Sequence, residues 1–221
     1  MPVIEKDLLK AIEQMTEKEA FIFDMDGLIF DTERLFMEQL AVVMQEHGYR
    51  LTREIYSDTL GLGGKHLVEK MQSYYGTEYP FTKISKETAE RTAVIADTVG
   101  LVVKPQIREV LMYLKKAGIG CAVASSTKSM VVRQYLEKSE LFPYFQRIIG
   151  GEMVNRSKPA PDIFLLTCEK LGKKPEQCVV LEDSENGVRA ALAAGCEVIC
   201  IPDLKEPAQE ILEKTAYVIR R

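Results

Sequence analysis

The sequence predicts an α/β protein with an all-helical insertion. From about residue 101 onward, short apolar runs alternate with segments of helical periodicity, the pattern of parallel strands joined by crossover helices. One more apolar run, at 20–23, lies far upstream, and the stretch between has helical patterns but no convincing strand. Helices on both faces of such a sheet give a three-layer, Rossmann-like parallel-sheet core. We therefore expect 1–34 and 101–221 to form the α/β core, and 35–100 to form an inserted helical domain.

The expected elements follow in chain order. Leu8, Leu9, Ile12 and Met15 recur at helical spacing, so a short amphipathic helix precedes the strand that ends at Phe23. A helix is expected to follow Glu33 and end near Gly48. In the insertion, the expected helices are 53–60, 65–75 and 86–98. In the remainder, the expected helices are 107–117, 130–138, 162–171, 187–194 and 207–214, and the strands are 120–124, 147–149, 178–181, 197–201 and 217–219.

Composition restricts the class of protein. The chain has 221 residues, of which 46% are hydrophobic and 28% charged, as in soluble globular proteins with a sizeable core. A net charge of -4 offers no general electrostatic attraction for nucleic acid, and no apolar run is long enough to span a membrane. The first 20 residues lack the apolar stretch of a signal peptide. The five cysteines form no Cys-x-x-Cys pair, so reduced buried thiols are expected. We expect a cytoplasmic monomer with no nucleic-acid or membrane partner.

The most informative residues are two carboxylates at the end of the first predicted core strand. Asp24 and Asp26 directly follow the apolar run and precede Gly27. Burying or crowding carboxylates costs free energy unless a cation or hydrogen bonds offset it. The pair therefore indicates a metal site or acid–base chemistry. Because Asp-Gly is also a common turn dipeptide, a polar turn is the alternative interpretation.

Three other segments bring polar side chains to the same predicted edge, since ligands of open parallel sheets sit at the carboxyl ends of strands. These segments are Ser125-Ser126-Thr127, the loop 157–162 with Lys158, and Glu182-Asp183-Ser184. Each has an ordinary alternative. Ser126 or Thr127 can cap the next helix, and Lys158 can be a solvated surface lysine. Glu182 and Asp183 can be favourable charges at a helix start. Because all four segments are expected to meet at one edge of the sheet, a functional site is favoured over four separate ordinary explanations.

The residue types at this edge fit phosphoryl transfer. Three or four carboxylates can hold Mg²⁺, which prefers oxygen ligands. The ion and a lysine neutralise the transferring group, while a hydroxyl donates to a phosphate oxygen. A carboxylate placed in line acts as the nucleophile and forms an aspartyl-phosphate intermediate. A second acid two residues further on protonates the leaving group and then activates water.

In this order, the motifs resemble those of the haloacid dehalogenase superfamily. The nearest likeness is to the helical-cap group that holds β-phosphoglucomutases and small sugar-phosphate phosphatases. The resemblance covers residues 21–219 and rests on four motifs. They are 23–33, which begins Phe23-Asp24-Met25-Asp26-Gly27, then Val123-Ala124-Ser125-Ser126, the segment 157–162, and Leu181-Glu182-Asp183-Ser184.

The resemblance implies roles for these residues. Asp24 is the nucleophile and Asp26 the general acid and base, while Ser125 and Lys158 bind the phosphoryl group. The implied ligands of Mg²⁺ are Asp24, the backbone carbonyl of Asp26, Glu182 and Asp183. By the same resemblance, residues 35–100 are the helical cap domain and the rest is the catalytic core. Because the cap carries a glycine cluster, we expect it to touch the substrate there. Lys128 can face the phosphate or be a surface lysine. The expected substrate-binding residues are Gly61, Leu62, Gly63, Gly64, Lys65, Ser126 and Lys128.

The resemblance also separates possible activities. Asp26 disfavours the dehalogenases and phosphonate hydrolases of the superfamily, which lack an acid there. β-Phosphoglucomutases carry a histidine soon after the first motif, where this chain reads Arg34-Leu35-Phe36, and an arginine in the cap loop, where the candidate cation is Lys65. We therefore expect a Mg²⁺-dependent phosphatase for a small phosphorylated metabolite, in particular a sugar phosphate. The alternatives are a β-phosphoglucomutase-type isomerase and a catalytically silent binding or regulatory protein.

Overall fold

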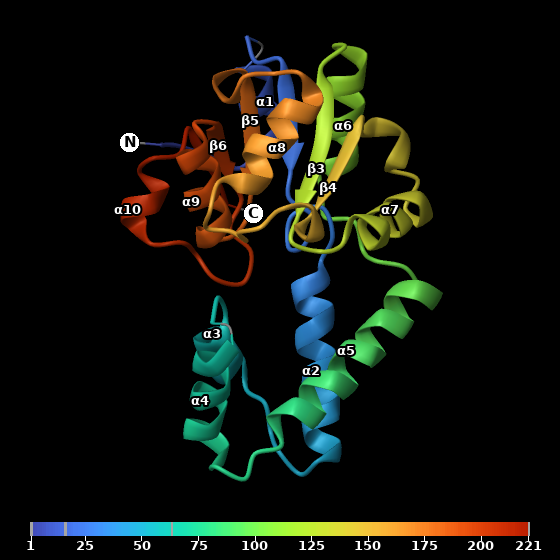
Figure 1. Cartoon of the computed structure of the whole chain (residues 1–221), viewed down its shortest axis with the longest axis vertical. Coiled ribbons are helices and arrows are strands. Elements are labelled where there is room, and N and C mark those ends of the chain that lie inside the picture. The colour runs from blue at the N-terminus through green and yellow to red at the C-terminus, as the bar shows by residue number, and fades with distance from the viewer. Residues whose placement is uncertain (1, 16, 63, 221) are drawn as a thin grey trace. The chain divides into compact units, whose positions relative to one another are not determined.

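The computed structural model describes residues 2–15, 17–62 and 64–220 (Figure 1). The chain forms two compact units. One comprises Met1–Asp31 and Leu101–Arg221 and is called the core unit below, and the other comprises Thr32–Gly100 and is called the helical unit. The helical unit starts at Thr32, where helix α2 begins, rather than at residue 35.

The core unit is built on a seven-stranded sheet in the described residues, and each strand pairs in parallel with its neighbours. The order across the sheet is β1-β7-β6-β5-β2-β3-β4. The strands are β1 (Val3–Glu5), β2 (Ala20–Phe23), β3 (Gly120–Ser125), β4 (Arg147–Gly150), β5 (Cys178–Glu182), β6 (Glu197–Cys200) and β7 (Tyr217–Ile219).

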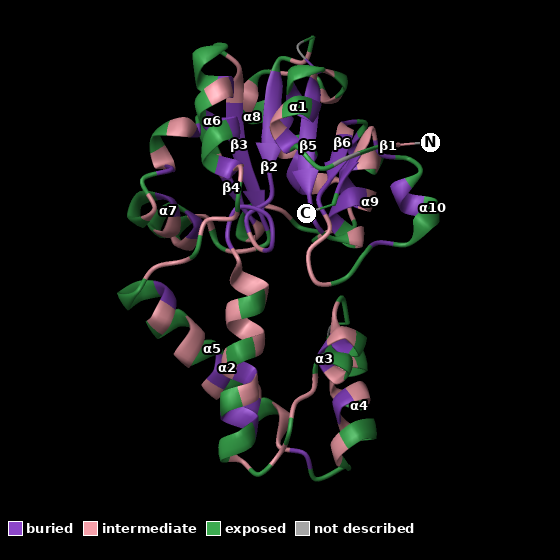
Figure 2. Ribbon diagram, turned by 180° about the vertical axis from the view of Figure 1, so that it is seen from behind, coloured by how far each residue is buried: buried purple, intermediate pink, exposed green. Residues whose placement is uncertain are grey.

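Helices cover both faces of this sheet. Along β2, Phe21 and Phe23 pack into one apolar cluster, while Ala20 and Ile22 pack into another, because successive side chains point to opposite faces. The first cluster includes residues of α1 (Leu8–Glu13), α6 (Ile107–Lys116) and α7 (Ser129–Lys138). The second includes residues of α8 (Asp162–Leu171), α9 (Glu185–Ala194) and α10 (Gln209–Leu212). The central strands β2, β3 and β5 are almost wholly buried between these layers (Figure 2), which confirms the predicted three-layer α/β core.

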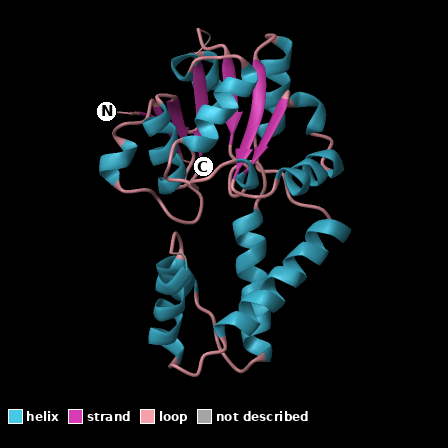
Figure 3. Cartoon of the chain, in the orientation of Figure 1, coloured by secondary structure: helices cyan, strands magenta, loops and turns pink. Residues whose placement is uncertain are grey.

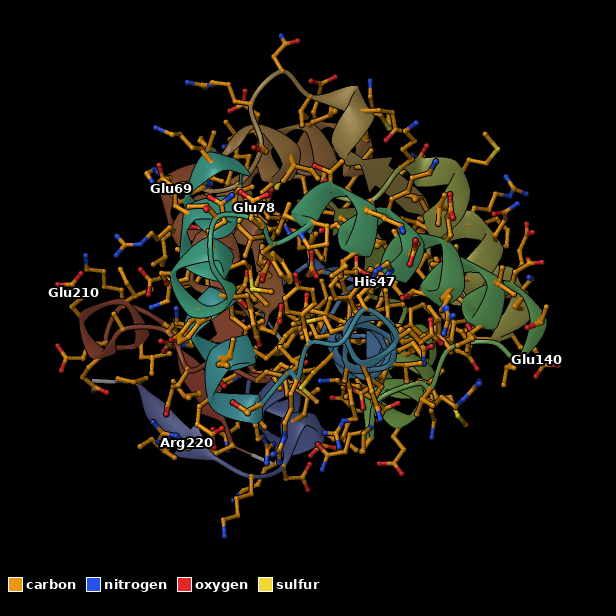
Figure 4. The ribbon with its side chains drawn as sticks, turned by 90° about the horizontal axis from the view of Figure 1, so that it is seen from below. His47, Glu69, Glu78, Glu140, Glu210 and Arg220 are labelled. Carbon is orange, nitrogen blue, oxygen red and sulfur yellow. The ribbon has the colours of Figure 1, made fainter. Side chains whose placement is uncertain are left out.

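Charged side chains cover the outside of the core unit. Glu140, which follows α7, Glu210 on α10, and Arg220 near the end of the chain are exposed and point outward in Figure 4. Short 3₁₀ helices at Phe142–Tyr144, Gly151–Met153 and Pro175–Gln177 complete the connections. All five cysteines are buried and none forms a disulfide, as the sequence predicted.

The described residues of the helical unit form helices and no strand (Figure 3). They are α2 (Thr32–Glu46), α3 (Arg53–Thr59), α4 (Gly64–Tyr75) and α5 (Phe81–Thr98). α2 packs against α5 and α3 against α4. His47, just beyond α2 and labelled in Figure 4, lies 2.7 Å from the carboxylate of Glu87 on α5.

The two largest differences from the sequence-based expectation concern β1 and α5, while α10 is shorter than expected, at Gln209–Leu212. β1 was not predicted, because its three residues lie in a charged segment and become a strand only by pairing with β7. α5 begins at Phe81 rather than at residue 86, since Pro80 can precede a helix and the first turns bury only Ile84. Among the described residues, no helix is both long and apolar enough to cross a bilayer.

Candidate active site

The predicted site residues meet because their strands are neighbours. β2 lies between β5 and β3, and Phe23 is in register with both Leu181 and Val123. The next residue on each strand is therefore Asp24, Glu182 or Ala124, at the carboxyl edge of the sheet. The carboxyl ends of three strands that are far apart in the sequence therefore meet in one place, as expected for an open parallel sheet.

Lys158 links these strands. Its Nζ donates to Asp24 Oδ1 at 2.5 Å, to Glu182 Oε1 at 2.5 Å, and to the backbone oxygen of Ala124 at 3.2 Å. The ammonium group also lies 4.9 Å from the centre of the Phe164 ring. Because the Lys158 side chain is only 8% exposed, the alternative of a solvated surface lysine does not apply.

The electrostatics of the site are dominated by burial. Burial raises the pKa of Asp24 to about 8; the charge of Lys158 opposes this shift, while Glu182 and Asp26 add to it. Burial likewise raises the pKa of Asp183 well above its ordinary value, and the charges of Glu182, Asp24 and Asp203 add to the shift. For Lys158, burial alone would lower the pKa, but Asp24 and Glu182 outweigh it and the pKa is raised. The carboxylates outnumber this lysine, so the site favours a further cation.

The carboxylates are placed to bind that cation. Asp24, Glu182 and Asp183 each offer an oxygen atom, and these atoms lie within 4.8 Å of one another. No other acidic, histidine or cysteine group of three in the described part of the chain meets this criterion. Hard oxygen donors with excess negative charge fit Mg²⁺ better than softer metals.

Asp26 has different partners from Asp24. Its Oδ2 accepts hydrogen bonds from Thr127 Oγ1 at 2.8 Å and Ser125 Oγ at 3.3 Å. The Ser125 hydroxyl oxygen in turn accepts from the backbone N–H of Thr127 at 3.0 Å. Thr127 was considered only as a possible helix cap, yet the cap position of α7 falls to Lys128, with no side-chain cap bond. The sequence feature that points to Thr127 is its place in the run Ser125-Ser126-Thr127 at the end of β3.

The turn after β5 fixes Glu182. Glu182 Oε2 accepts from the backbone N–H groups of Asp183 at 3.1 Å and Ser184 at 3.2 Å, and from the Ser184 hydroxyl at 3.1 Å. Ser184 also caps α9 by accepting from the Gly187 N–H at 3.1 Å. An ideal Cβ at Gly187 would lie 1.9 Å from the Glu182 carboxyl carbon, so this close approach requires glycine. Glu182 is therefore rigidly placed rather than a general charge at a helix start.

The remaining predicted residues are less closely connected to this cluster. Ser126 and Lys128 are exposed in the segment between β3 and α7. In the helical unit, Gly61 and Leu62 line a cavity of about 320 Å³. Lys65 is exposed and pairs with Glu69 at 3.2 Å. Gly64 begins α4, and Gly63 lies outside the described residues.

The cavity of the helical unit is mainly apolar with a few polar groups. Tyr56, on α3, donates its hydroxyl to Glu33 Oε2 on α2 at 3.1 Å. The other lining residues include Phe36, Leu40, Met71, Tyr79 and Phe81. Neither Glu33 nor Tyr56 can be recognised as a cavity residue from the sequence, because they lie on different helices, α2 and α3, that only the fold brings together.

The chain is similar to known hydrolases and phosphatases. A family model described as haloacid dehalogenase-like hydrolase matches residues 21–201. A phosphorylated carbohydrates phosphatase of Thermotoga maritima is 33% identical over 181 residues, which cover 82% of this chain and 83% of the relative. Hexitol phosphatase B of Escherichia coli K12 is 33% identical over 190 residues, covering 83% of each protein.

A solved structure gives a similar result. A variant of CbbY from Rhodobacter sphaeroides, crystallised in complex with xylulose-(1,5)bisphosphate, matches with a TM-score of 0.69 and 28% identity. The match covers 91% of this chain and 93% of the CbbY chain.

Proposed function

The chain belongs to the family of haloacid dehalogenase-like hydrolases and is a phosphatase, and we propose that it hydrolyses a small phosphorylated sugar in a Mg²⁺-dependent reaction. The single observation that carries this proposal is the Lys158 bridge, which joins Asp24 to Glu182 while Asp26 stands two residues further along the same loop. The named relatives that act on phosphorylated carbohydrates and hexitols support the choice of substrate.

In the proposed reaction, Asp24 attacks phosphorus and forms an aspartyl-phosphate, while the bond to the leaving oxygen breaks. Asp26 donates a proton to that oxygen and then accepts one from the water that hydrolyses the intermediate. Ser125 and Lys158 orient and neutralise the phosphoryl group. Asp24, Glu182, Asp183 and the backbone carbonyl of Asp26 are the proposed holders of Mg²⁺. The ion supplies additional neutralisation of the phosphoryl charge.

The helical unit is the proposed source of substrate selectivity. Its cavity, lined by Gly61, Leu62, Tyr56 and Glu33, is of the size and chemistry expected for a small organic ligand. A carboxylate beside a phenol can accept a hydrogen bond from a sugar hydroxyl. Lys128 and Ser126 are proposed to contact the substrate's phosphate from the core unit.

The helical unit also bears on the mutase alternative. A mutase must hold a second phosphate firmly, because its intermediate is a bisphosphate. The lysine in the segment 61–65 is Lys65, whose exposed side chain pairs with Glu69. This arrangement supports a hydrolase over a β-phosphoglucomutase-type isomerase, and the assay below distinguishes the two.

The test is phosphate release from an aryl phosphate and a panel of sugar phosphates with and without Mg²⁺. We expect Mg²⁺-dependent release, and Asp24→Asn should lower kcat at least about 10³-fold because the nucleophile is lost. Asp97→Asn, an exposed carboxylate on α5, is the matched control and should retain activity. Activity that survives Asp24→Asn would overturn the covalent mechanism.

The same panel separates the alternatives. Equal kcat/KM for all esters would contradict selectivity by the helical unit. Isomerisation of a hexose 1-phosphate that requires a bisphosphate activator would establish a mutase. Neither release nor isomerisation from any compound would favour a silent binding or regulatory protein.

A further inference from the structure

A buried ion pair stands beside the proposed metal site and belongs to none of the four motifs. Lys104, which follows the helical unit in the chain, forms an ion pair with Asp203 Oδ1, and each side chain is only 11% exposed. The same ammonium group lies 3.8 Å from Asp31 Oδ1. Removing two charges from solvent costs free energy. This cost is offset only where the geometry of the pair is good and its remaining polar atoms have partners.

Backbone hydrogen bonds fix both partners relative to the site. Asp203 follows β6, and the N–H of Ile201 donates to the Glu182 carbonyl at 2.7 Å, which holds this segment against the end of β5. The N–H of Lys104 donates to the Ile29 carbonyl at 2.8 Å, in the loop that also carries Asp24 and Asp26. The ion pair therefore joins two segments, each of which is hydrogen-bonded to a segment that supplies proposed metal ligands.

The second oxygen of Asp203 faces the metal site. Within residues 2–15, 17–62 and 64–220, this buried Oδ2 has no hydrogen-bond partner. An ideal Cβ on Gly27 would lie 2.3 Å from Asp183 Oδ2 and 3.4 Å from Asp203 Oδ2. The two carboxylate oxygens thus converge over the bare Cα of Gly27. A buried acceptor without a donor is unfavourable, so this position calls for a donor from outside the chain.

We propose that Asp203 is a positioning residue for the Mg²⁺ site, whose Oδ2 accepts a hydrogen bond from a water molecule of the bound ion. Lys104 holds the other oxygen, so that the carboxylate keeps its orientation towards Asp183. This inference rests on the Mg²⁺ dependence proposed above. Mg²⁺ keeps several waters when bound by proteins, and partners outside the direct ligands typically contribute 10- to 100-fold to metal affinity.

The experiment is titration calorimetry of Mg²⁺ into the metal-free full-length protein. We expect Asp203→Ala to weaken Mg²⁺ binding by about 10- to 100-fold. Asp203→Asn retains an oxygen that can accept the same hydrogen bond, so it should lose less. Lys104→Met should also weaken binding, because Asp203 is then no longer held. Glu19→Gln is the control, since Glu19 pairs with Lys173 at 2.6 Å at the opposite end of β2.

The outcomes separate this role from a merely structural one. If Asp203 acts on the ion, the phosphatase activity of Asp203→Asn and Asp203→Ala should fall at low Mg²⁺ and recover at saturating Mg²⁺. Unchanged Mg²⁺ affinity in both variants, with wild-type binding intact, would overturn the role of Asp203 alone. No Mg²⁺ binding by the wild-type protein would overturn this inference together with the proposed Mg²⁺ dependence.

Discussion

Two aspartates two residues apart have different surroundings, and that difference fits different tasks. Asp24 accepts a hydrogen bond from the ammonium group of Lys158. This positive charge offsets the negative charge of a carboxylate that is proposed to attack a phosphorus atom. Asp26 instead accepts hydrogen bonds from the neutral hydroxyls of Thr127 and Ser125. A carboxylate held by neutral donors can exchange a proton without first leaving an ion pair.

Asp26 and Thr127 can be tested by a pair of substitutions. Asp26→Asn should lower kcat by about 10²- to 10⁴-fold, the usual contribution of a general acid or base. Thr127→Val removes one hydrogen bond to this carboxylate and should cost about tenfold in kcat with a smaller effect on KM. Steady-state kinetics on the best substrate of the panel measure both.

The matched control is Thr98→Val, because Thr98 donates its hydroxyl to its own helix at Val94 and lies in the helical unit. It should leave kcat within about twofold, as a surface substitution usually does. A Thr127→Val enzyme with wild-type kcat would contradict the role of Thr127 in holding Asp26.

At the scale of single residues, the sequence predicts the position of those candidate site residues that lie at or directly after the end of a strand. Asp24, Ser125 and Glu182 could be placed because the carboxyl ends of parallel strands share one edge. Thr127 was read as a cap, since a hydroxyl near a helix start usually is one. Asp203 could not be placed from the sequence although it follows β6, a neighbour of β5, because Ile201 and Pro202 lie between β6 and Asp203 and hide which way its side chain points.

At the scale of elements, prediction succeeded where local pattern and tertiary burial agree. β2 and residues 178–181 of β5 are continuous apolar runs buried on both faces, which is the signature of central parallel strands. β1 has no such pattern, because it lies at the edge of the sheet and exists through its pairing with β7. The start of α5 was placed too late because its first turns are largely polar and only Ile84 is buried there.

The packing of α9 on β5 gives a prediction in which helix propensity and the site oppose each other. Gly187 lies inside α9, where alanine normally stabilises a helix by roughly 0.5–1 kcal/mol. Here the new methyl group would overlap the Glu182 carboxylate, because an ideal Cβ lies 1.9 Å from its carboxyl carbon. Gly187→Ala should therefore lower the free energy of unfolding by about 1–3 kcal/mol, as overpacking does. Chemical denaturation measures this change.

Asn186→Ala is the control for Gly187→Ala. Asn186 is the preceding residue of the same helix and is exposed, so alanine there should raise helix propensity without a clash. We expect this variant to be equal to the wild type or slightly more stable. A stabilising Gly187→Ala would mean that Glu182 moves aside at little cost, which would contradict its rigid placement.

At the scale of the whole molecule, charge must be balanced locally. The chain carries a net charge of -4, so its overall field repels anionic phosphate esters. Its site also buries several carboxylates around one lysine, which costs stability unless a cation is bound. Substrate binding, metal binding and folding are therefore linked in this protein through the same few groups.

This linkage predicts how stability depends on pH and Mg²⁺. Burial raises the pKa of Asp24 to about 8, and that of Asp183 is also raised, so without Mg²⁺ the folded protein binds more protons than the unfolded chain. The contribution of these two carboxylates to the free energy of unfolding of the metal-free protein should then fall as pH rises from about 4 to 8. Protons and Mg²⁺ compete for the same carboxylates, so Mg²⁺ should stabilise the protein more at pH 8 than at pH 5.

Thermal unfolding with Mg²⁺ or with EDTA, at both pH values and constant ionic strength, measures the effect. A Mg²⁺ concentration about 100 times the Kd at pH 8 should add about 2.7 kcal/mol to the free energy of unfolding. For a chain of 221 residues, this corresponds to an increase in Tm of about 5–10 °C. Asp24→Asn removes one competing carboxylate, so both the Mg²⁺ effect and its pH dependence should shrink. An equal Mg²⁺ effect at pH 5 and pH 8 would contradict binding of the ion at these carboxylates.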